Sequence, residues 1–331
     1  MSDIRYRASD RIQEIIAKSE AGELTRDDLL YIFNVEPYSL DWYTLRWAED
    51  DLTRRMSGGI AEVYGQVGID ALPCPMDCKF CSFAVSNNHR TGELKMPLDE
   101  IIDYARKYQE QNANVITIMI TVDYDFGEYL EIMAALREAL GPDMPLMANM
   151  GDFTPKMARQ LKDVGVGSVY HAVRVGEGID TKIHVEARFE TIQAAHEAGL
   201  KVSTSLESIG PEYSDERIAD LMMRLLDLKP EQGGCGGRVN VKNTRGEDVP
   251  GHKPGRMAMY GAAFRLYAGK NMRFGCGTYG WAEVGTNPRD HSSHTEKDGL
   301  IKMTCGYVPQ MRERFRANGF TVDEAPSAFW R

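Results

Sequence analysis

The sequence predicts an α/β fold, a (β/α) TIM-type barrel, full or partial, with an N-terminal helical extension. Two observations lead to this prediction. Helix-period patterns fill the first part of the chain, and after them apolar strand-like runs alternate with helix-period runs. Repeated strand–helix units form parallel sheets with right-handed crossovers, and their number here favours a barrel over an open sheet. The length of 331 residues is common for one such barrel.

The helical extension is predicted to cover residues 1–57. Its apolar residues recur at spacings of three and four within Asp10–Lys18, Thr25–Phe33 and Trp42–Met56. Thr25 is typical of a helix N-cap because acidic residues fill the turn after it. Two glycines then end the helical pattern.

The barrel is predicted to cover residues 58–280. The apolar, β-rich run Val115–Thr121 is typical of a strand that is buried on both faces. The expected strands are Val63–Leu72, Val115–Thr121, Met144–Asn149, Ser168–Val173, Leu200–Leu206, Arg238–Lys242 and Asn271–Gly275. The expected helices are Leu98–Asn112, Gly127–Leu140, Pro155–Val164, Val185–Ala198, Asp215–Leu228 and Arg256–Ala268.

Residues 281–331 are predicted to form a lid loop and the C-terminal closure of the barrel. The stretch 281–297 is polar and typical of an ordered loop, and Tyr307–Asn318 has a helical pattern that ends at a glycine. The sequence contains no evident internal repeat and no low-complexity linker that would mark a further domain.

The composition is that of a soluble globular protein, with 43% hydrophobic and 27% charged residues. No apolar run approaches the length of a membrane span, so we expect no membrane partner. The formal charge of −10 argues against a nucleic-acid partner. The N-terminus lacks the apolar core of a secretory signal, and we therefore expect a cytoplasmic protein whose thiols stay reduced.

The most informative motif is the cysteine triplet Cys74, Cys78 and Cys81, spaced C-x3-C-x2-C, with Phe80 directly before its last member. It follows the first expected strand, and loops after the strands of a barrel carry the reactive groups. Three thiolates on a four-iron cluster leave one iron without a protein ligand. A small molecule can bind that iron and receive an electron from the cluster.

Other uses of three cysteines remain open. A zinc site takes four Cys or His ligands, and His89 is a candidate for the fourth. The other cysteines, however, form no second CxxC pair. A disulfide would leave one of the three thiols unpaired, and ordinary ferredoxin clusters use four thiolates.

The triplet and its aromatic residue resemble the signature of radical S-adenosylmethionine (SAM) enzymes. This resemblance implies a 4Fe–4S cluster held by the three cysteines, with SAM on the open iron. Reductive cleavage of SAM then gives a 5′-deoxyadenosyl radical that removes hydrogen from a small-molecule substrate. It also implies an electron donor such as flavodoxin or ferredoxin, and an oxygen-sensitive cluster suited to an anaerobic host. The competing interpretation is a non-catalytic zinc or iron–sulfur binding module.

Within that superfamily the sequence resembles the biotin-synthase-like group, which includes methylornithine synthase and the hydrogenase maturase. The segments Phe80–Phe83 and Arg90–Gly92 are similar to biotin synthase after its own triplet. Arg188 lies eleven residues before Gly199, where the group carries an arginine that binds the SAM carboxylate. A guanidinium suits bidentate carboxylate binding.

The same resemblance implies further SAM contacts. Phe80 and Phe83 are expected to shield the cluster and flank the adenine, and Asp123 is a candidate acceptor for the SAM ammonium group. Ser208 lies on the expected adenine strand, beside an acid where relatives tend to be apolar. Relatives also place an acid at the position of Arg174, and Glu177 is its candidate replacement.

Biotin synthase uses a second cluster as its sulfur source, with ligands on three barrel strands that contain no cysteine in this sequence. Only Cys235, Cys276 and Cys305 remain as candidate ligands of a second cluster. Cys235 is expected in a glycine-rich loop before a strand, and Cys276 directly after a strand. Sulfur insertion therefore stays an alternative to a rearrangement or fragmentation like that of methylornithine synthase.

Several polar residues are candidates for binding the substrate, and the cationic ones suggest a carboxylate-bearing substrate. A further metal site at His291, His294 and Glu296 is a weaker alternative, because histidines three apart in a polar loop are usually surface residues. The substrate candidates are Asn149, His171, Asn240, Lys242 and Arg273.

Overall fold

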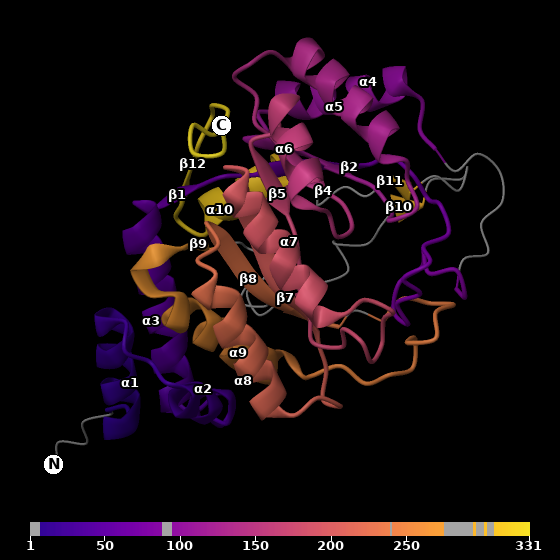
Figure 1. Cartoon of the computed structure of the whole chain (residues 1–331). Helices are drawn as coiled ribbons and strands as arrows, with labels where there is room; N and C mark the ends of the chain where they lie inside the picture. The colour runs from indigo at the N-terminus through magenta and orange to yellow at the C-terminus, as the bar shows by residue number, and fades with distance from the viewer. Residues whose placement is uncertain (1–6, 88–94, 239, 275–293, 296–300, 303–307) are drawn as a thin grey trace, which may run out of the picture.

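A curved sheet of parallel strands forms the centre of the structure, and helices cover its outer side (Figure 1). The computed structural model describes residues 7–87, 95–238, 240–274, 294–295, 301–302 and 308–331. The strand order is β2-β3-β4-β5-β7-β8-β9, and β6 pairs with β7 beside β5. Neighbouring strands follow each other along the chain, and over the described residues they do not close into a ring, which gives a partial barrel.

The barrel strands are β2 (Tyr64–Gly68), β3 (Val115–Met119), β4 (Leu146–Asn149), β5 (Ser168–Tyr170), β6 (Val173–Arg174), β7 (Lys201–Ile209), β8 (Gln232–Gly237) and β9 (Arg273–Phe274). Two pairs of short strands lie outside this sheet: β1 (Ile60–Ala61) with β12 (Thr321–Val322), and β10 (His294–Thr295) with β11 (Ile301–Lys302).

The helices are α1 (Asp10–Ala21), α2 (Arg26–Phe33), α3 (Leu40–Ser57), α4 (Leu98–Glu110), α5 (Phe126–Leu140), α6 (Pro155–Asp163), α7 (Val185–Glu197), α8 (Asp215–Asp227), α9 (Pro254–Ala268), the short 3-10 helix η1 (Gly269–Asn271) and α10 (Val308–Ala317). The fold class that the sequence predicts is thus confirmed. No described helix combines the length and the apolarity that crossing a bilayer requires.

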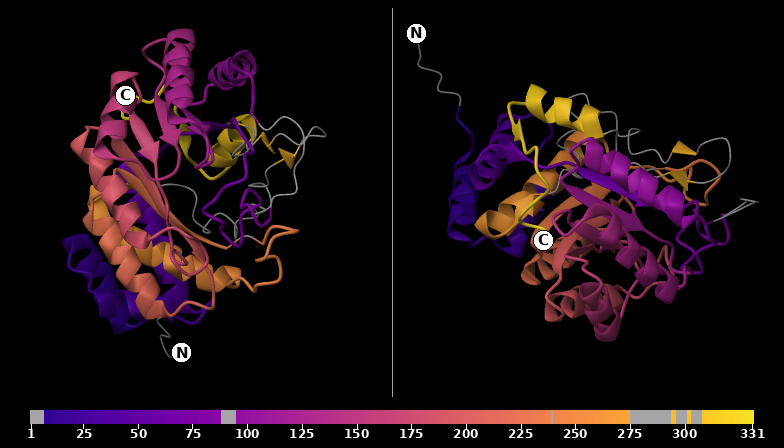
Figure 2. Two further views of the ribbon diagram at one scale, coloured as in Figure 1. Left: turned by 45° about the vertical axis from the view of Figure 1, so that its right-hand side comes forward. Right: turned by 90° about the horizontal axis from the view of Figure 1, so that it is seen from above.

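The N-terminal helices pack on one side of the barrel, against α8 and α9 (Figures 1 and 2). Capping side chains fix the N-terminal ends of α2 and α3. Thr25 and Asp28 form a capping box at α2, and the Ser39 hydroxyl accepts a hydrogen bond at the start of α3. The indole nitrogen of Trp42 donates to the carbonyl of Gly255 on α9 at 2.9 Å. Helices α1–α3 share one hydrophobic core with the barrel. The division of the chain at residues 57 and 280 stays a prediction.

The strand expected at Arg238–Lys242 is wrong, because β8 precedes it and ends at Gly237. Glycine is depleted in strands, and the run of four glycines around Cys235 is therefore typical of a loop. Packing explains why glycine is needed here. A Cβ atom on Gly233 would lie 3.1 Å from the Met272 sulfur and from the Phe264 ring, so helix α9 approaches the bare backbone.

The amino ends of the strands are closed by residues 327–331, which we call the floor segment. Trp330 is fully buried and packs with Val115 and Met147. Its indole nitrogen donates to the Tyr64 hydroxyl at 2.6 Å, and Gln232 on β8 donates to the same oxygen at 3.0 Å. The Tyr64 hydroxyl thus links β2, at one edge of the sheet, with β8, the last strand but one in the sheet order.

Candidate active site

The cysteine triplet lies on a loop that follows β2, at the carboxyl end of the sheet. The loop folds back on itself: the Cys74 amide donates to the Phe83 carbonyl at 2.7 Å, and the Val85 amide donates to the Cys74 carbonyl at 3.0 Å. The amide of Cys81 donates to the carbonyl of Cys78 at 3.1 Å. Backbone hydrogen bonds therefore bring the first cysteine against the chain that follows the last one.

Two polar residues that the sequence did not single out hold this loop. Asn87 is buried, and its side-chain amide donates to the carbonyls of Cys78, Lys79 and Cys81 at 3.0–3.4 Å. Asp77 has a φ of 52°, a conformation that Asp adopts more readily than most residues, and its carboxylate accepts from Ser86 at 3.0 Å. An Asp and an Asn close to a cysteine triplet are therefore sequence signals for residues that hold the cysteine loop in place.

The three thiols are close enough to affect one another electrostatically. Burial, opposed by the charge of Arg174 and helped by the neighbouring thiols, raises the pKa of the Cys78 thiol to about 12. Burial also raises the pKa of Cys81. Metal binding displaces the thiol proton. In the described part of the chain, no three His, Cys, Asp or Glu side chains form a group that could hold a single metal ion.

Two other loops cover the cysteine loop. After β8, Arg245 donates to the Asp77 carbonyl at 2.6 Å, and Gly246 lies where a Cβ atom would be 3.3 Å from the Phe80 Cα. Between β6 and α7, the Asp180 carboxylate pairs with Lys79 at 2.8 Å. The cysteine loop is therefore enclosed by chain from the far side of the sheet.

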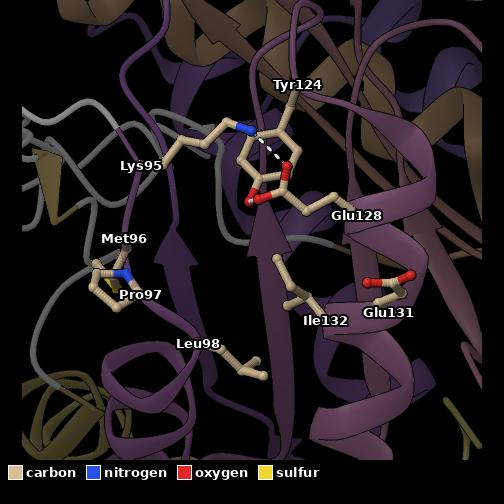
Figure 3. A pocket seen from close by; sticks show the side chains of 8 residues that line it. All are labelled: Lys95, Met96, Pro97, Leu98, Tyr124, Glu128, Glu131 and Ile132. Atoms are coloured by element: carbon tan, nitrogen blue, oxygen red, sulfur yellow. Dashed lines mark hydrogen bonds and ion pairs between the residues drawn. The ribbon is translucent and has the colours of Figure 1, made fainter.

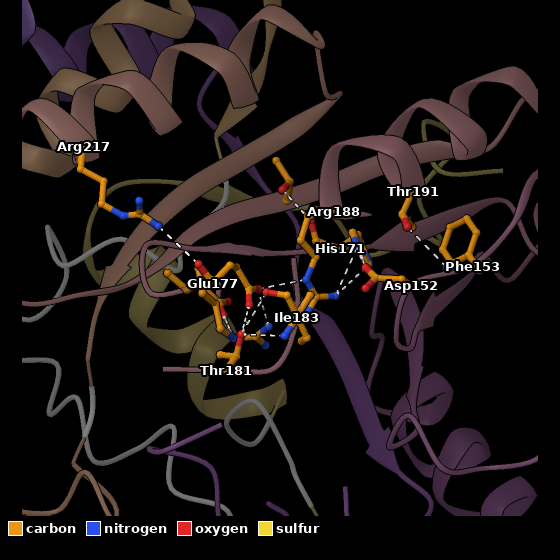
Figure 4. A network of polar contacts seen from close by, with 12 residues as sticks. Asp152, Phe153, His171, Glu177, Thr181, Ile183, Arg188, Thr191 and Arg217 are labelled. Atoms are coloured by element: carbon orange, nitrogen blue, oxygen red, sulfur yellow. Dashed lines mark hydrogen bonds and ion pairs between the residues drawn. The ribbon is translucent and has the colours of Figure 1, made fainter. Parts of the chain in front are cut away.

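Beside these loops lies a network centred on Arg188, which is 5% exposed on α7 (Figure 4). Its Nε donates to Glu177 Oε1 and its Nη1 donates to Asp152 Oδ1, both at 3.0 Å. His171 Nε2 lies 3.0 Å from the same Asp152 oxygen, and the Thr181 hydroxyl donates to Glu177 at 2.6 Å. The structure thus brings together Arg188, Glu177 and His171, three of the residues that the sequence singles out.

The electrostatics of this network follow from its burial. Burial lowers the pKa of His171 to about 4, and the charges of Arg188 and Arg174 act in the same direction. His171 is therefore neutral at ordinary pH. Burial alone would raise the pKa of Asp152, but the hydrogen bond from His171 and the charge of Arg188 hold it below its usual value.

A second charged pair lies between this network and the thiols. Arg174 on β6 and Glu207 on β7 are register partners in the sheet, with Nε and Oε2 3.6 Å apart. Arg174 also lies 3.5 Å from Glu177 Oε1, and the Tyr170 hydroxyl donates to Glu207. These charges raise the pKa of Arg174 against the effect of its burial.

Comparison with known families identifies the region that carries these groups. Residues 73–225, from the cysteine loop to α8, match the radical SAM superfamily. The chain carries a radical SAM domain. Membership of this superfamily implies a 4Fe–4S cluster and SAM as cofactors, and the thiols of Cys74, Cys78 and Cys81 fit such a cluster in number and chemistry.

The radical SAM domain is similar in sequence to biotin synthases. The chain is 28% identical over 201 residues to that of Pelotomaculum thermopropionicum, which covers 57% of this chain and 61% of the relative. It is 26% identical over 300 residues to that of Carboxydothermus hydrogenoformans, which covers 87% and 89%. In three of the biotin synthases, including that of Pelotomaculum thermopropionicum, the match spans about three fifths of the relative's length.

Solved structures share the fold of the radical SAM domain. Methylornithine synthase (PylB) superimposes with a TM-score of 0.70 at 14% identity, over 93% of this chain and 97% of that one. The FeFe-hydrogenase maturase HydG of Carboxydothermus hydrogenoformans gives 0.70 at 14%, over 97% and 81%. At this identity the likeness is one of fold.

The remaining predicted SAM contacts stay predictions. Phe80 and Phe83 lie half-buried on the cysteine loop. Asp123 is exposed in the turn between β3 and α5. Ser208 is buried with a φ of 57°, at the point where the register between β7 and β8 shifts. A left-handed residue inside a strand marks a bulge, which turns the neighbouring side chains.

The candidate substrate residues separate into two groups. Asn149 ends β4 and His171 follows β5, both at the carboxyl end of the sheet. Asn240 and Lys242 are exposed in the loop after β8 instead of lying on a strand, which corrects their expected placement. Asn240 uses its amide to hold that loop, donating to the Glu247 and Val249 carbonyls at 2.7 Å.

The expectation that Cys235 lies in a loop is also wrong. It lies on β8, is 1% exposed, and belongs to the main hydrophobic core. Side chains alternate along a strand, and Gln232 faces the barrel interior, so Cys235 faces the helices. Cys276, Cys305, His89, the segment 90–92, the lid 281–293, His291 and Glu296 lie outside the described residues. Of Arg273 and His294 only the backbone is described.

A surface pocket of about 380 Å³ lies apart from the thiols, between the start of α4 and α5 (Figure 3). Lys95 lies over the Tyr124 ring at 4.4 Å, and the Tyr124 hydroxyl donates to Glu128 at 2.9 Å. Its polar groups thus bind one another, and neither the thiols nor Arg188 line it.

Proposed function

We propose that this chain is a radical SAM enzyme that acts on a small molecule. When bound, its cofactors would supply a 5′-deoxyadenosyl radical by reductive cleavage of SAM. One observation carries the proposal: a loop with three thiols lies at the carboxyl end of a parallel partial barrel, inside the region that matches the superfamily. The enclosing loops would exclude water and oxygen from the reaction.

The chain's own residues would hold SAM by its amino-acid end and its adenine. Arg188 is the proposed ligand of the SAM carboxylate, and Glu177 and Asp152 orient its guanidinium through hydrogen bonds of 3.0 Å. Phe80 and Phe83 would flank the adenine, with Ser208 on the strand beside it, and Asp123 would accept from the SAM ammonium group. Electrons would come from a carrier such as flavodoxin or ferredoxin.

A rearrangement or fragmentation is favoured over sulfur insertion. Sulfur insertion of the biotin-synthase kind needs a second cluster inside the barrel, and β3, β4 and β7 contain no cysteine. Cys235, the remaining thiol of the described residues, faces the helices. This supports a reaction that needs only the cluster of the triplet.

Anaerobic reconstitution with iron and sulfide, followed by an assay for 5′-deoxyadenosine with SAM and dithionite, tests the proposed function. We expect about four irons per chain, and deoxyadenosine that disappears in Cys78→Ala. Cys235→Ala is the matched control and is expected to keep both. A colourless protein with one zinc and no deoxyadenosine would support the non-catalytic module, and eight irons that fall to four in a Cys276→Ala variant would favour sulfur insertion.

A further inference from the structure

The interior face of β7 carries a line of polar side chains. Ser203, Ser205 and Glu207 alternate with core residues along the strand, and their partners are interior side chains. Ser203 donates to Gln232 at 2.7 Å. Burial raises the pKa of the Tyr170 phenol, and the hydroxyl of Ser205 lies close enough to oppose that rise. The Tyr170 hydroxyl donates to Glu207. This wall therefore ends in a carboxylate near the carboxyl end of the sheet.

The neighbouring strand β8 offers no side chains on the same face. The register pairs Ser205 with Gly234, and Gly236 is the next residue on that face. Gly233 and Cys235 occupy the opposite face and pack in the core with Phe264. On its β8 side the interior of the barrel is thus bounded by backbone, and backbone that lacks Cβ atoms allows a ligand close approach.

The charges at the carboxyl end of the sheet favour a cationic ligand. Among the described side chains, three carboxylates (Glu177, Glu207 and Asp152) are linked to two guanidinium groups (Arg174 and Arg188). His171 adds no charge because it is neutral at ordinary pH. Within these ion pairs the carboxylates outnumber the guanidinium groups by one, and Arg217, whose guanidinium donates to the Val175 and Glu177 carbonyls, lies at the edge of the network. A carboxylate-bearing substrate, which the sequence suggested, would add to that excess.

We propose that Glu207, together with the hydroxyls of Tyr170 and Ser205, binds an ammonium group of the substrate against the glycine face of β8. The inference rests on the proposed function and names its substrate class: a small amine that also carries hydrogen-bonding groups. Arg174 keeps the Glu207 carboxylate in place from the adjoining strand and is a positioning residue.

Two probes of equal length and opposite charge test this assignment, 5-aminopentanol and 5-hydroxypentanoate. Their binding to the reconstituted protein is followed by ligand-observed NMR with SAM at saturation. We expect saturable binding of the amine and none of the acid. In Glu207→Gln the affinity for the amine should fall on the order of 10-fold or more, as the loss of a charge-assisted hydrogen bond predicts.

Three controls separate binding from folding. Glu207→Asp should recover part of the affinity, and Glu186→Gln should leave it unchanged, because Glu186 pairs with Arg224 on the outer surface with 63% of its side chain exposed. SAM affinity, measured by equilibrium dialysis, should not change in Glu207→Gln. The proposal is overturned if the acid binds as well as the amine, if neither binds, or if Glu207→Gln weakens SAM alone. A preparation that binds the amine but never SAM contradicts the proposed function and leaves the charge preference standing.

Discussion

The carboxyl end of the barrel carries thiols and linked charges, whereas its amino end is closed by a buried aromatic residue and side-chain hydrogen bonds. At the carboxyl end, the buried Arg188 and Glu177 bind each other, and Arg188 also binds Asp152 on the loop after β4. At the amino end, Trp330 fills the interior between strands. The difference separates two tasks, since loops after the strands of a barrel carry chemistry and the opposite end carries stability.

Trp330→Ala is expected to give the largest effect of the three changes that test this separation. Removing a fully buried tryptophan leaves a cavity and should lower the free energy of unfolding by about 3–5 kcal/mol. Urea denaturation measures this loss. Trp47→Ala, at a site 64% exposed, is the matched control and should change little. If Trp330→Ala weakened SAM binding without loss of stability, the two ends would not be separate.

Arg188→Lys should have an effect of intermediate size. This change should lower the affinity for SAM and leave the stability of the fold unchanged. Lysine cannot reproduce the planar guanidinium, so SAM affinity should fall about 10- to 100-fold. Equilibrium dialysis with the reconstituted protein measures it. Arg224→Lys on the outer surface should bind SAM normally. Unchanged SAM affinity in Arg188→Lys would assign this arginine to a structural ion pair.

His171 should give the smallest effect, and one that depends on pH. Its pKa is about 4 in the folded protein and near 6.5 in the unfolded chain, so between these values the unfolded chain binds a proton that the folded protein does not. Stability should therefore fall as the pH falls, by on the order of 1 kcal/mol between pH 7 and 5.5.

Urea denaturation at both pH values checks this decline in stability. The part that comes from His171 should be missing in His171→Gln and retained in His184→Gln, which changes an exposed histidine. An equal decline in all three proteins would mean that His171 titrates normally.

Periodicity predicted most of the fold, because apolar residues at helical or strand spacing determine which face is buried. It failed at β8, where Gly233 leaves room for helix α9, a packing requirement that is visible only in three dimensions. That single error moved Cys235 into a loop and put Asn240 and Lys242 on a strand.

The cysteine triplet could be predicted from spacing alone because its ligands are adjacent in sequence. The partners of Arg188 could be predicted only in part, since Asp152 follows a different strand and has no local motif. The pairing of Arg174 with Glu207 depends on strand register, which the sequence does not state. Contacts between elements far apart in the chain are the information that a single sequence lacks.

The floor segment has a consequence for the order of folding. Trp330 contacts Tyr64 and Val115, more than two hundred positions earlier in the chain. Contacts of such long sequence separation carry a large loop-closure entropy and form late. We therefore expect a refolding intermediate whose strands are already protected from hydrogen exchange while the indole of Trp330 is still in water.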